Sequence, residues 1–492
     1  MEALDWLVIG VFFLALIGII VWVVRQKQND SADYFLGGRD ATWLAIGASI
    51  FASNIGSEHL IGLAGAGASS GMAMAHWEIQ GWMILILGWV FVPFYTRSMV
   101  YTMPEFLERR YNPQSRTILS VISLVSYVLT KVAVTVYAGG LVFQQVFGIK
   151  ELWGIDFFWI AAIGLVVLTA LYTIFGGMKS VLYTSVLQTP ILLLGSLIIL
   201  VLGFKELGGW DEMMRVCGAV TVNDYGDTMT NLIRSNDDAN FPWLGALIGS
   251  AIIGFWYWCT DQFIVQRVLS GKNEMEARRG TIFGAYLKLL PVFLFLIPGM
   301  IAFALHQKYI GAGGEGFLPM LANGTANADA AFPTLVAKLL PAGVKGLVVC
   351  GILAALMSSL ASLFNSSAML FTIDFYKRFR PETPEKKLVG IGQVATVVIV
   401  ILGILWIPIM RSVGDVLYTY LQDVQSVLAP GIAAAFLLGI CWKRTSAQGG
   451  MWGLIAGMVI GLTRLGAKVY YSNAGEVADS TFKYLFYDMN WL

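Results

Sequence analysis

Apolar runs of about 20 residues, the length that a helix needs to cross a bilayer, recur from Leu4 to the region of Tyr471. The composition agrees with them, because 57% of the 492 residues are hydrophobic and only 13% are charged. A water-soluble core does not need repeated runs of this length, so the sequence predicts an all-α polytopic membrane protein. The expected spans lie near residues 4–24, 43–67, 77–96, 117–147, 157–176, 181–203, 242–266, 282–306, 344–373, 388–410, 418–441 and 449–471.

Basic residues gather in alternate connecting loops, and this asymmetry predicts the orientation, because Lys and Arg accumulate on the cytoplasmic side. Three of these loops hold Arg97, Arg109, Arg110 and Arg116, then Arg267, Lys272, Arg278 and Arg279, then Lys377, Arg378, Arg380, Lys386 and Lys387. We therefore expect a multi-pass protein of the cell (plasma) membrane with its N-terminus outside. The first span lacks a basic leader and a cleavage site, so we do not expect a signal peptide. The final stretch, STFKYLFYDMNWL, is interpreted as the approach to another helix.

Several functional classes lack support in the sequence. The net charge is only +1, which gives no reason to expect a nucleic-acid partner. The loop G-x-x-x-x-G-K-[ST] is absent, so we do not expect ATP to drive the protein. Only three histidines occur, and no HExxH motif accompanies them, so we expect neither an enzyme nor an organic cofactor.

The stretch SNIGSEHLIG, residues 53–62, places polar residues and two glycines inside an expected span. Its polar side chains include Asn54, Glu58 and His59. A span interrupted in this way is typical of transporters, in which unwound backbone frees carbonyl oxygens for a cation. Irregular backbone is tolerated at membrane depth only where it lines a cavity or is buried in protein. The break therefore predicts a binding site near the middle of the membrane.

A second polar stretch, AALMSSLASLFNSS at residues 354–367, carries Ser358, Ser359 and Ser362 at helical spacing. Small hydroxyl residues in membrane helices often serve packing alone. Here five serines fall within ten residues, and Na⁺ prefers oxygen ligands as other hard cations do. The stretch therefore favours a cation site.

Ionisable side chains within spans are costly and mark candidate functional positions. The carboxylate of Glu78 and the ammonium of Lys288 lie deep in two different spans, and their opposite charges predict one buried polar network. For Lys131 and Asp423 the simpler interpretation is helix packing, in which each group pairs with a neighbour.

These stretches resemble the sodium/glucose cotransporter branch of the solute:sodium symporter family. The matching motifs run from residue 32 to beyond residue 440, and WYWCTDQ is typical of the sugar-transporting members. They are ADYFLGGR (32–39), ASNIGSEHLIGLAGAG (52–67), YTMPEFLERR (101–110), WYWCTDQFIVQRVLS (256–270), YLKLLP (286–291), LMSSLASLFNS (356–366), TIDFY (372–376) and LLGICWKR (437–444).

The resemblance implies a LeuT-like five-plus-five inverted repeat, with one extra N-terminal helix and extra C-terminal helices. The implied units are the extra helix at 1–30, a first repeat with its outer loop at 31–241, a second repeat at 242–445 and a C-terminal part at 446–492. The span containing SNIGSEHLIG is then the first core helix, and the span containing WYWCTDQ is its inverted partner. The polar runs at 53–59 and 256–262 occupy corresponding positions in the two repeats.

The resemblance also implies a secondary active symporter that couples inward Na⁺ movement to the uptake of a neutral sugar, a hexose, by alternating access. The implied sodium ligands are the backbone carbonyls of Ala52, Ile55 and Ala355 and the hydroxyls of Ser358 and Ser359. The implied sugar contacts are Asn54, His59, Glu78, Lys288 and Gln422, and the implied gate is Tyr257 with Trp258 beside it. Polar and aromatic groups of these kinds suit the hydroxyls and the apolar ring face of a sugar.

A single coupling ion is expected. Relatives that carry a second ion resemble one another in an aspartate on the fifth core helix and a hydroxyl residue after the paired serines. In this chain these positions are Ser185 and Ala361. Because a second cation in a low-dielectric site needs compensating charge, the loss of the carboxylate predicts one Na⁺ per sugar.

Other interpretations remain at this point. Within the transporters, they are a symporter for inositol, sialic acid, a carboxylate or an amino acid, and in another class a passive channel. Glu78, Lys288 and Gln422 favour a neutral polyol over an anion, because no arginine is expected beside them to clamp a carboxylate. Some relatives carry a polar residue at Gly81 or Gly254, so these motifs do not determine the sugar.

Overall fold

The computed structural model describes residues 1–26, 28, 30–56, 58–238, 241–321, 324–413, 417–473 and 481–488. Within the helices, the side chains at 129–130, 145, 409–413, 417–424, 468–469, 472–473 and 487–488 lie outside the described part. The described chain is almost entirely helical, with one short strand pair, β1 (Glu151–Leu152) and β2 (Ile155–Asp156).

The α-helices of the first half are α1 (Ala3–Val24), α2 (Ser31–Leu36), α3 (Trp43–Asn54), α4 (Ala64–Ser70), α5 (His76–Ile79), α6 (Met83–Ile86), α7 (Val92–Ser98), α8 (Met103–Arg110), α9 (Pro113–Ser126), α10 (Ala133–Phe147), α11 (Phe157–Leu207) and α12 (Trp210–Gly218). Those of the second half are α13 (Trp243–Gly254), α14 (Gln262–Leu269), α15 (Glu274–Leu287), α16 (Ile297–Gly311), α17 (Ala331–Leu339), α18 (Val344–Met369), α19 (Lys377–Phe379), α20 (Glu385–Val413), α21 (Leu417–Cys441), α22 (Ala447–Asn473) and α23 (Thr481–Lys483).

Tighter and wider helical turns continue many of these helices. The 3₁₀ turns are η1 (Gly37–Arg39), η3 (Gly71–Ala75), η4 (Gln80–Trp82) and η9 (Ala328–Ala330). The π-helical turns are η2 (Glu58–Leu63), η5 (Leu87–Phe91), η6 (Tyr127–Val132), η7 (Phe255–Thr260), η8 (Val292–Leu296), η10 (Leu370–Tyr376) and η11 (Tyr484–Asp488). Such turns occur frequently at functional sites inside helices.

Eight helical runs among the described residues are long and apolar enough to cross a membrane. They are Ala3–Val24, Glu58–Ser98, Phe157–Leu207, Trp243–Thr260, Glu274–Gly311, Val344–Phe379, Glu385–Pro408 and Ala447–Ala467. Three shorter apolar helices accompany them: Trp43–Asn54, Ala133–Gln144 and Gln425–Cys441. Every expected span overlaps at least one of these segments, and Phe157–Leu207 contains two of the spans. The expected span 43–67 is divided between Trp43–Asn54 and Glu58–Ser98, and only part of 117–147 coincides with Ala133–Gln144.

The two spans within α11 are separated by a single glycine rather than by a loop. Gly177 has φ 54° and ψ −150°, a backbone conformation that interrupts the helix and that glycine adopts without strain. A Cβ atom at this position would lie 2.4 Å from the carbonyl oxygen of Tyr34. The close approach of α2 to α11 therefore depends on the missing side chain.

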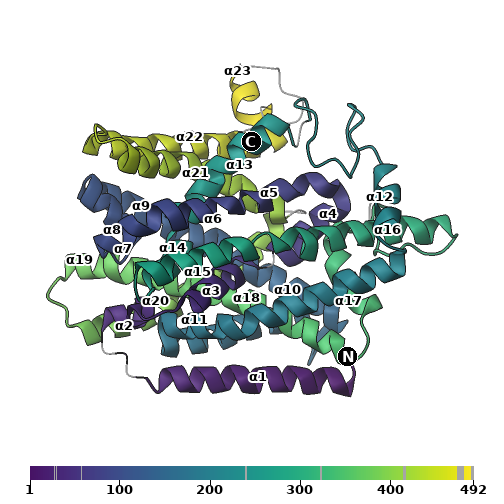
Figure 1. Ribbon diagram of the computed structural model, residues 1–492, viewed down its shortest axis with the longest axis horizontal. Coiled ribbons are helices and arrows are strands. Elements are labelled where there is room, and N and C mark those ends of the chain that lie inside the picture. Colours follow the sequence, from purple (N-terminus) through teal and green to yellow (C-terminus); the bar gives the residue numbers. More distant parts are fainter. Residues whose placement is uncertain are drawn as a thin grey trace.

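The long helices run side by side along the longest axis of the molecule (Figure 1). α1 lies along one side, α21 and α22 lie along the opposite side, and α3, α14, α15 and α18 lie between them. In this central layer α3 packs against α11, α15 and α18, and α18 also packs against α11. The polar stretches that the sequence singled out thus lie at the centre of the helix bundle.

A polar contact joins α1 to the start of α18. The carboxylate of Asp5 accepts hydrogen bonds from the backbone N–H groups of Gly343 and Gly346, at 2.7 and 2.8 Å. These N–H groups belong to the first turn of α18, where helix donors have no partner within the helix. Asp5 therefore caps α18 from a different helix.

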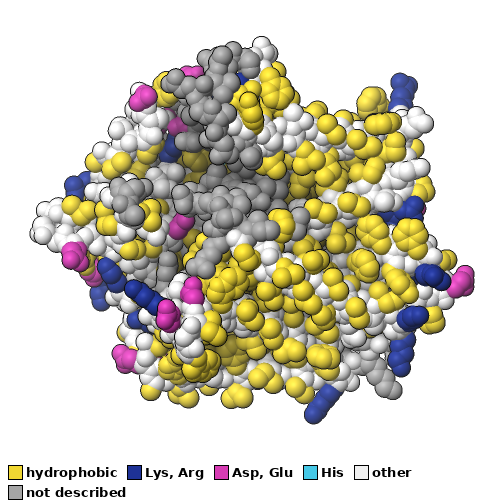
Figure 2. Space-filling view, turned by 180° about the vertical axis from the view of Figure 1, so that it is seen from behind, with side chains coloured by type: hydrophobic (Ala, Val, Ile, Leu, Met, Phe, Trp, Pro, Cys, Tyr) yellow, Lys and Arg dark blue, Asp and Glu magenta, His cyan; other side chains and the backbone are white. Residues whose placement is uncertain are grey.

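Hydrophobic side chains form a broad band over the face of the molecule seen in Figure 2, and charged side chains lie mainly toward its two ends. α1 presents Leu7, Val11 and Leu14 outwards with more than half of their surface exposed. A band of this kind is the surface expected of a protein whose outer face contacts lipid.

Candidate functional site

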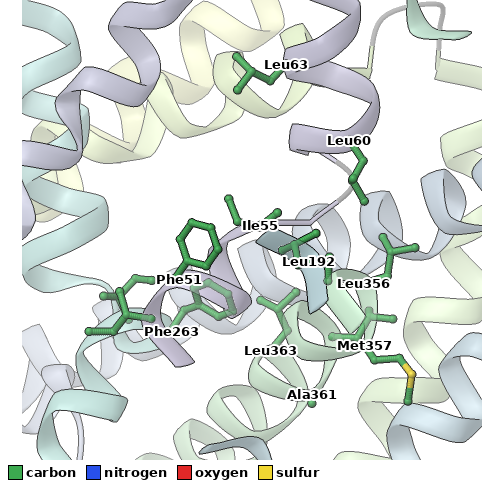
Figure 3. Close-up of a cluster of buried hydrophobic side chains, with 14 of the residues drawn as sticks. Phe51, Ile55, Leu60, Leu63, Leu192, Phe263, Leu356, Met357, Ala361 and Leu363 are labelled. Atoms are coloured by element: carbon green, nitrogen blue, oxygen red, sulfur yellow. The ribbon is translucent and has the colours of Figure 1, made fainter. Parts of the chain in front are cut away.

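The first break in a membrane helix lies between α3 and η2, where the sequence predicted it. α3 ends at Asn54, and the next residue, Ile55, has an extended backbone with φ −79° and ψ 100°. The last carbonyl groups of α3 consequently lack the helical partners that a continuous helix would supply. Figure 3 shows buried hydrophobic side chains around this break, including Phe51, Leu60 and Phe263. The irregular backbone is thus enclosed by protein, as membrane depth requires.

The second break lies between η7 and α14, at the end of the polar run 256–262 that the resemblance matched with the first break. η7 ends at Thr260, and Asp261 has an extended backbone with φ −73° and ψ 127° before α14 begins at Gln262. The side chain of Asp261 accepts the backbone N–H of Phe263 at 3.1 Å and so caps α14.

Serine side chains of α18 face the end of α3 and the middle of α11. The hydroxyl of Ser359 donates to the carbonyl oxygen of Ser53 at 2.6 Å. The hydroxyl oxygens of Ser362 and Ser53 are 2.8 Å apart, and those of Ser358 and Ser185 are 3.2 Å apart. All five side chains are buried. Three helices therefore bring their hydroxyl groups to one cluster, which we call the serine cluster.

The three residues expected to supply carbonyl ligands lie in the same layer. Ala52 and Ile55 are buried at the end of α3, and Ala355 is buried one turn before the paired serines of α18. α3 and α18 are in direct contact. The structure thus places all five expected sodium ligands on the two helices that meet at the first break.

A buried arginine adjoins the serine cluster. Arg267 lies in α14 with 1% of its surface exposed, and its Nε donates to Ser49 Oγ at 3.2 Å and to Ser53 Oγ at 3.1 Å. Its guanidinium lies over the ring of Phe263. Among the described residues, no carboxylate lies within 4.0 Å of the guanidinium, and Nη1 has no hydrogen-bond partner.

The sequence placed Arg267 in a cytoplasmic loop, and that expectation is wrong. α14 continues through Arg267 to Leu269 and holds the arginine side chain against α3. The signal was present in the sequence, because Arg267 follows Phe263 by one helical turn within the apolar run QFIVQRVL.

A compact polar group on three helical segments links Glu78 of α5, His59 of η2 and Lys288 at the end of α15. Lys288 Nζ lies 2.6 Å from Glu78 Oε2 and 2.8 Å from His59 Nε2. His59 Nε2 lies 3.2 Å from Glu78 Oε1. Glu78 and Lys288 each expose only 3% of their surface, so the predicted buried network between them is confirmed. We call these three residues the polar triad.

Gly81 gives Lys288 room to reach the triad. A Cβ atom on Gly81 would lie 2.6 Å from Lys288 Cγ, so a serine at this position would displace the lysine stem. The ammonium of Lys288 also lies 5.6 Å from the centroid of the Trp258 ring. The position of the Lys288 side chain therefore depends on a glycine at residue 81.

The side chains of Asn54 and Tyr257 connect the two breaks. Asn54 Nδ2 donates to the hydroxyl of Tyr257 at 2.9 Å, and the rings of Tyr257 and Trp258 meet edge to face at 4.9 Å. Asn54 Oδ1 and His59 Nδ1 are buried without a hydrogen-bond partner among the described residues. Gln422, the remaining expected sugar contact, belongs to α21 at a position whose side chain lies outside the described part.

Lys131 of η6 forms a buried ion pair with Asp261, with Nζ 2.7 Å from Oδ2. The hydroxyl of Tyr127 donates to the other oxygen of the same carboxylate, and the ammonium lies 4.7 Å from the centroid of the Tyr257 ring. The expected pairing of Lys131 with a neighbouring group is thus confirmed. The side chain of Asp423 lies outside the described part.

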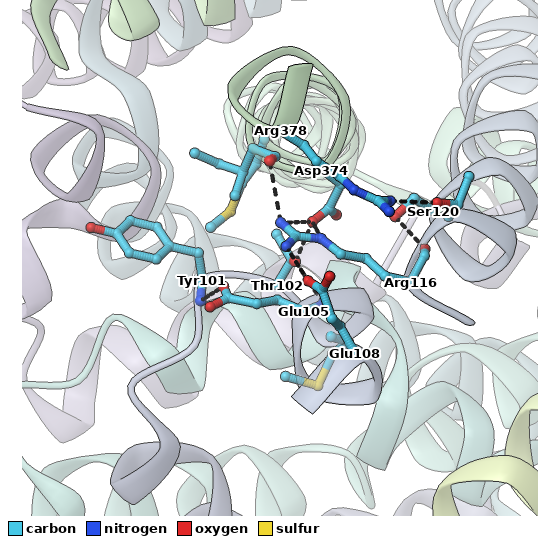
Figure 4. A network of polar contacts seen from close by, with 12 residues as sticks. Tyr101, Thr102, Glu105, Glu108, Arg116, Ser120, Asp374 and Arg378 are labelled. Atoms are coloured by element: carbon cyan, nitrogen blue, oxygen red, sulfur yellow. Dashed lines mark hydrogen bonds and ion pairs between the residues drawn. The ribbon is translucent and has the colours of Figure 1, made fainter. Parts of the chain in front are cut away.

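A further polar network joins α8, α9 and η10 (Figure 4). Asp374 Oδ1 accepts from Thr102 Oγ1 at 2.8 Å and from Arg116 Nε at 2.7 Å. Arg116 also contacts Glu108 Oε2 at 2.6 Å and the carbonyl oxygen of Ile373 at 3.2 Å. The motifs YTMPEFLERR and TIDFY meet here, so their polar residues form a connection between helices rather than part of the serine cluster or the triad.

Comparison with known proteins determines the family. Residues 34–457 match the model of the sodium:solute symporter family. The chain belongs to the sodium:solute symporter family. It is 38% identical over 479 residues to human sodium/myo-inositol cotransporter 2, covering 94% of this chain and 70% of that protein. It is also 38% identical over 510 residues to rat sodium/glucose cotransporter 2, covering 99% of this chain and 75% of that protein.

Solved structures agree with this family assignment at the level of the fold. A Na⁺-coupled sialic acid symporter is 22% identical with a TM-score of 0.77, covering 94% of this chain and 98% of that chain. A complex of the transporter MhsT with L-phenylalanine is 13% identical with a TM-score of 0.54, covering 86% and 96%. The LeuT-like helical fold expected from the sequence is confirmed. As a member of the sodium:solute symporter family, the chain is a Na⁺-coupled solute symporter, and the relatives are transporters rather than enzymes.

Proposed function

We propose that this protein couples inward movement of Na⁺ to uptake of a neutral sugar, a hexose, by alternating access. The observation that carries the proposal is an oxygen-rich serine cluster at the end of α3 and a charge-balanced polar triad that includes His59 of η2, one on each side of the first helix break. A hard cation suits the cluster. A neutral polyol suits the triad, because its carboxylate and ammonium already neutralise each other and leave no net charge for an ionic substrate.

The sodium site combines the carbonyls of Ala52, Ile55 and Ala355 with the hydroxyls of Ser358 and Ser359. Support comes from the end of α3 at Asn54, which frees carbonyl groups next to α18. Broken membrane helices coordinate coupling ions in this manner in other transporters. Na⁺ bound here stabilises the break and favours one state of the transporter by its differential affinity for the two states.

The sugar site includes Asn54, His59, Glu78, Lys288 and Gln422. Asn54 Oδ1 and His59 Nδ1 have no protein partner among the described residues and remain available to sugar hydroxyls. The edge of Tyr257 and the face of Trp258 adjoin these polar groups. Tyr257 is the inner gate in this proposal, because its hydroxyl bond to Asn54 ties the second break to the first.

One Na⁺ moves with each sugar. Relatives with a second ion resemble one another in having an aspartate at the position of Ser185. The hydroxyl of Ser185 lies 3.4 Å from Ser49 Oγ. Ser49 Oγ in turn accepts a hydrogen bond from Arg267. The serine cluster thus already holds one cationic group with no carboxylate within 4.0 Å in the described part. A second Na⁺ in this low-dielectric cluster would meet the like charge of Arg267, and Ser185 does not supply the carboxylate that would compensate it.

The two repeats are 31–241 and 242–445, with an extra helix at 1–30 and a C-terminal part at 446–492. The N-terminus is outside and the protein lies in the plasma membrane. Support for this orientation comes from the basic elements α8 and α19, which lie at the end of the molecule opposite the N-terminus (Figure 1). The membrane potential then drives Na⁺ inward with about 2.3 kcal/mol per charge per 100 mV.

A second candidate is uptake of inositol, a cyclic neutral polyol. The observation that favours it is the identity of 38% to human sodium/myo-inositol cotransporter 2. The same triad would serve either substrate, since both present neighbouring hydroxyl groups.

The test is uptake by proteoliposomes offered labelled glucose, galactose, myo-inositol and sialic acid, each with Na⁺ or with choline in its place. We expect Na⁺-dependent uptake of a neutral hexose. Na⁺-dependent uptake of myo-inositol alone would support the second candidate. Uptake of sialic acid alone, or equal uptake in choline, would contradict the proposal.

A further inference from the structure

The carboxylate of Glu58 lies beside the proposed sodium ligand Ser359. Glu58 is the first residue of η2, directly after the first break. A Cβ atom built on Gly56 would lie 2.5 Å from Glu58 Oε2 and 3.0 Å from Ser359 Oγ. The carboxylate oxygen of Glu58 and the hydroxyl oxygen of Ser359 are therefore both within 3.0 Å of the position that a Cβ atom on Gly56 would take. This position adjoins the backbone of the first break.

Gly56 makes this approach possible. A larger residue would place its Cβ atom at the position just described, and the carboxylate of Glu58 would have to move away from it. The break consequently brings the acidic side chain back towards α18 rather than leading it away. A carboxylate directed towards the meeting point of α3 and α18 is what a cation bound there would require.

Within the described part of the chain, Glu58 forms no close ion pair, and the ammonium groups of Lys131 and Lys288 act on its charge only from more than 4.0 Å away. Three buried carboxylates of the central helices have close cationic partners: Glu78 has Lys288, Asp261 has Lys131, and Asp374 has Arg116. Among the described residues, Glu58 has neither an ion pair nor a hydrogen bond. Its side chain is partly buried, and a carboxylate in such surroundings is stabilised by a nearby cation.

We propose that Glu58 is an additional, anionic ligand of the coupling Na⁺. The inference rests on the proposed sodium site and extends it. The other five ligands are neutral oxygens, so without Glu58 the ion would bring an uncompensated positive charge into the bundle. The carboxylate of Glu58 supplies the missing negative charge and a hard oxygen donor of the kind that such cations prefer. Glu58 therefore belongs to the ion site, whereas His59, the next residue, belongs to the triad.

The experiment measures Na⁺ binding to the purified full-length protein in the absence of sugar, by ²²Na⁺ scintillation proximity. The variants are Glu58→Gln, which keeps the shape and removes the charge, and Glu58→Asp, which keeps the charge. Glu78→Gln is the matched control, because it removes a buried carboxylate from the polar triad instead. Sugar affinity is measured for each variant at saturating Na⁺.

We expect Glu58→Gln to weaken Na⁺ binding at least about ten-fold, because a charged ligand is replaced by a neutral one. Glu58→Asp should lose less Na⁺ affinity than Glu58→Gln, and Glu78→Gln should keep Na⁺ affinity near wild type while losing sugar affinity. Sugar binding by Glu58→Gln at saturating Na⁺ shows that this variant is folded.

Two results would overturn the inference. One is Na⁺ affinity of Glu58→Gln equal to that of the wild type, and the other is a loss confined to sugar affinity, which would move Glu58 into the substrate site. Failure of the proposed function itself would be distinct, because the wild-type protein would then bind no Na⁺ in the same assay.

Discussion

Neutralising Glu78 should separate its contribution to stability from its contribution to sugar binding. The carboxylate is buried and lies 2.6 Å from Lys288 Nζ and 3.2 Å from His59 Nε2. Glu78→Gln leaves the ammonium of Lys288 buried without a counter-charge. Removing one partner of a buried ion pair costs roughly 3–5 kcal/mol of stability.

The effect on sugar binding has a different origin. A hydrogen bond to a charged group contributes roughly 1.5–3 kcal/mol, which corresponds to a loss of about 10- to 150-fold in affinity at about 1.4 kcal/mol per decade. We expect Glu78→Gln to weaken sugar affinity within this range and to leave Na⁺ affinity, measured without sugar, nearly unchanged.

The double variant Glu78→Gln, Lys288→Met distinguishes the two contributions. It removes the unpaired ammonium together with its partner, so we expect thermal stability in detergent to recover relative to Glu78→Gln alone. Sugar affinity should stay low, since neither charged group is present to bind hydroxyls. Recovery of both stability and sugar affinity in the double variant would refute the assignment of the triad to the substrate site.

Three further predictions concern the ion ratio and the fold. Reversal potentials should give one Na⁺ per sugar, and the double variant Ser185→Asp, Ala361→Thr should raise the ratio; a ratio of two in the wild type would contradict the role given to the serine cluster. Arg116→Met leaves the buried carboxylate of Asp374 without its cationic partner and should lower the free energy of unfolding by roughly 3–5 kcal/mol. The control is the double variant Asp374→Asn, Arg116→Met, whose free energy of unfolding should fall less. Gly177→Ala should lower the melting temperature, because a residue with a side chain costs of order 1–3 kcal/mol in this backbone conformation; an unchanged melting temperature would show that the kink can relax.

The sequence predicted the breaks because local composition determines them. Glycine and polar residues at SNIGSEHLIG predicted the first break, the resemblance implied a second at the corresponding run 256–262, and the structure interrupts both helices. The predicted network of Glu78 and Lys288 followed from the cost of an unpaired charge in a membrane. These inferences needed no knowledge of which helices are neighbours.

Contacts between segments that lie far apart in the chain could not be predicted from the sequence. The partner of Lys131 is Asp261, 130 residues away, and only the packing of η6 against the second break brings them together. The run QFIVQRVL carried a signal that Arg267 continues the helix, but its hydrogen bonds to Ser49 and Ser53 of α3 could not be predicted from the sequence. The approach of Glu58 to Ser359 likewise depends on the packing of α3 and the first break against α18.

The central claim is that the Na⁺ gradient drives sugar uptake, and accumulation against a concentration gradient tests it most directly. Proteoliposomes with an inward Na⁺ gradient are offered labelled hexose, and the internal concentration is followed with time. The account predicts a transient rise above the external concentration that disappears when an ionophore collapses the Na⁺ gradient. Equilibration to the external concentration with or without Na⁺ would contradict it and would indicate a passive pathway.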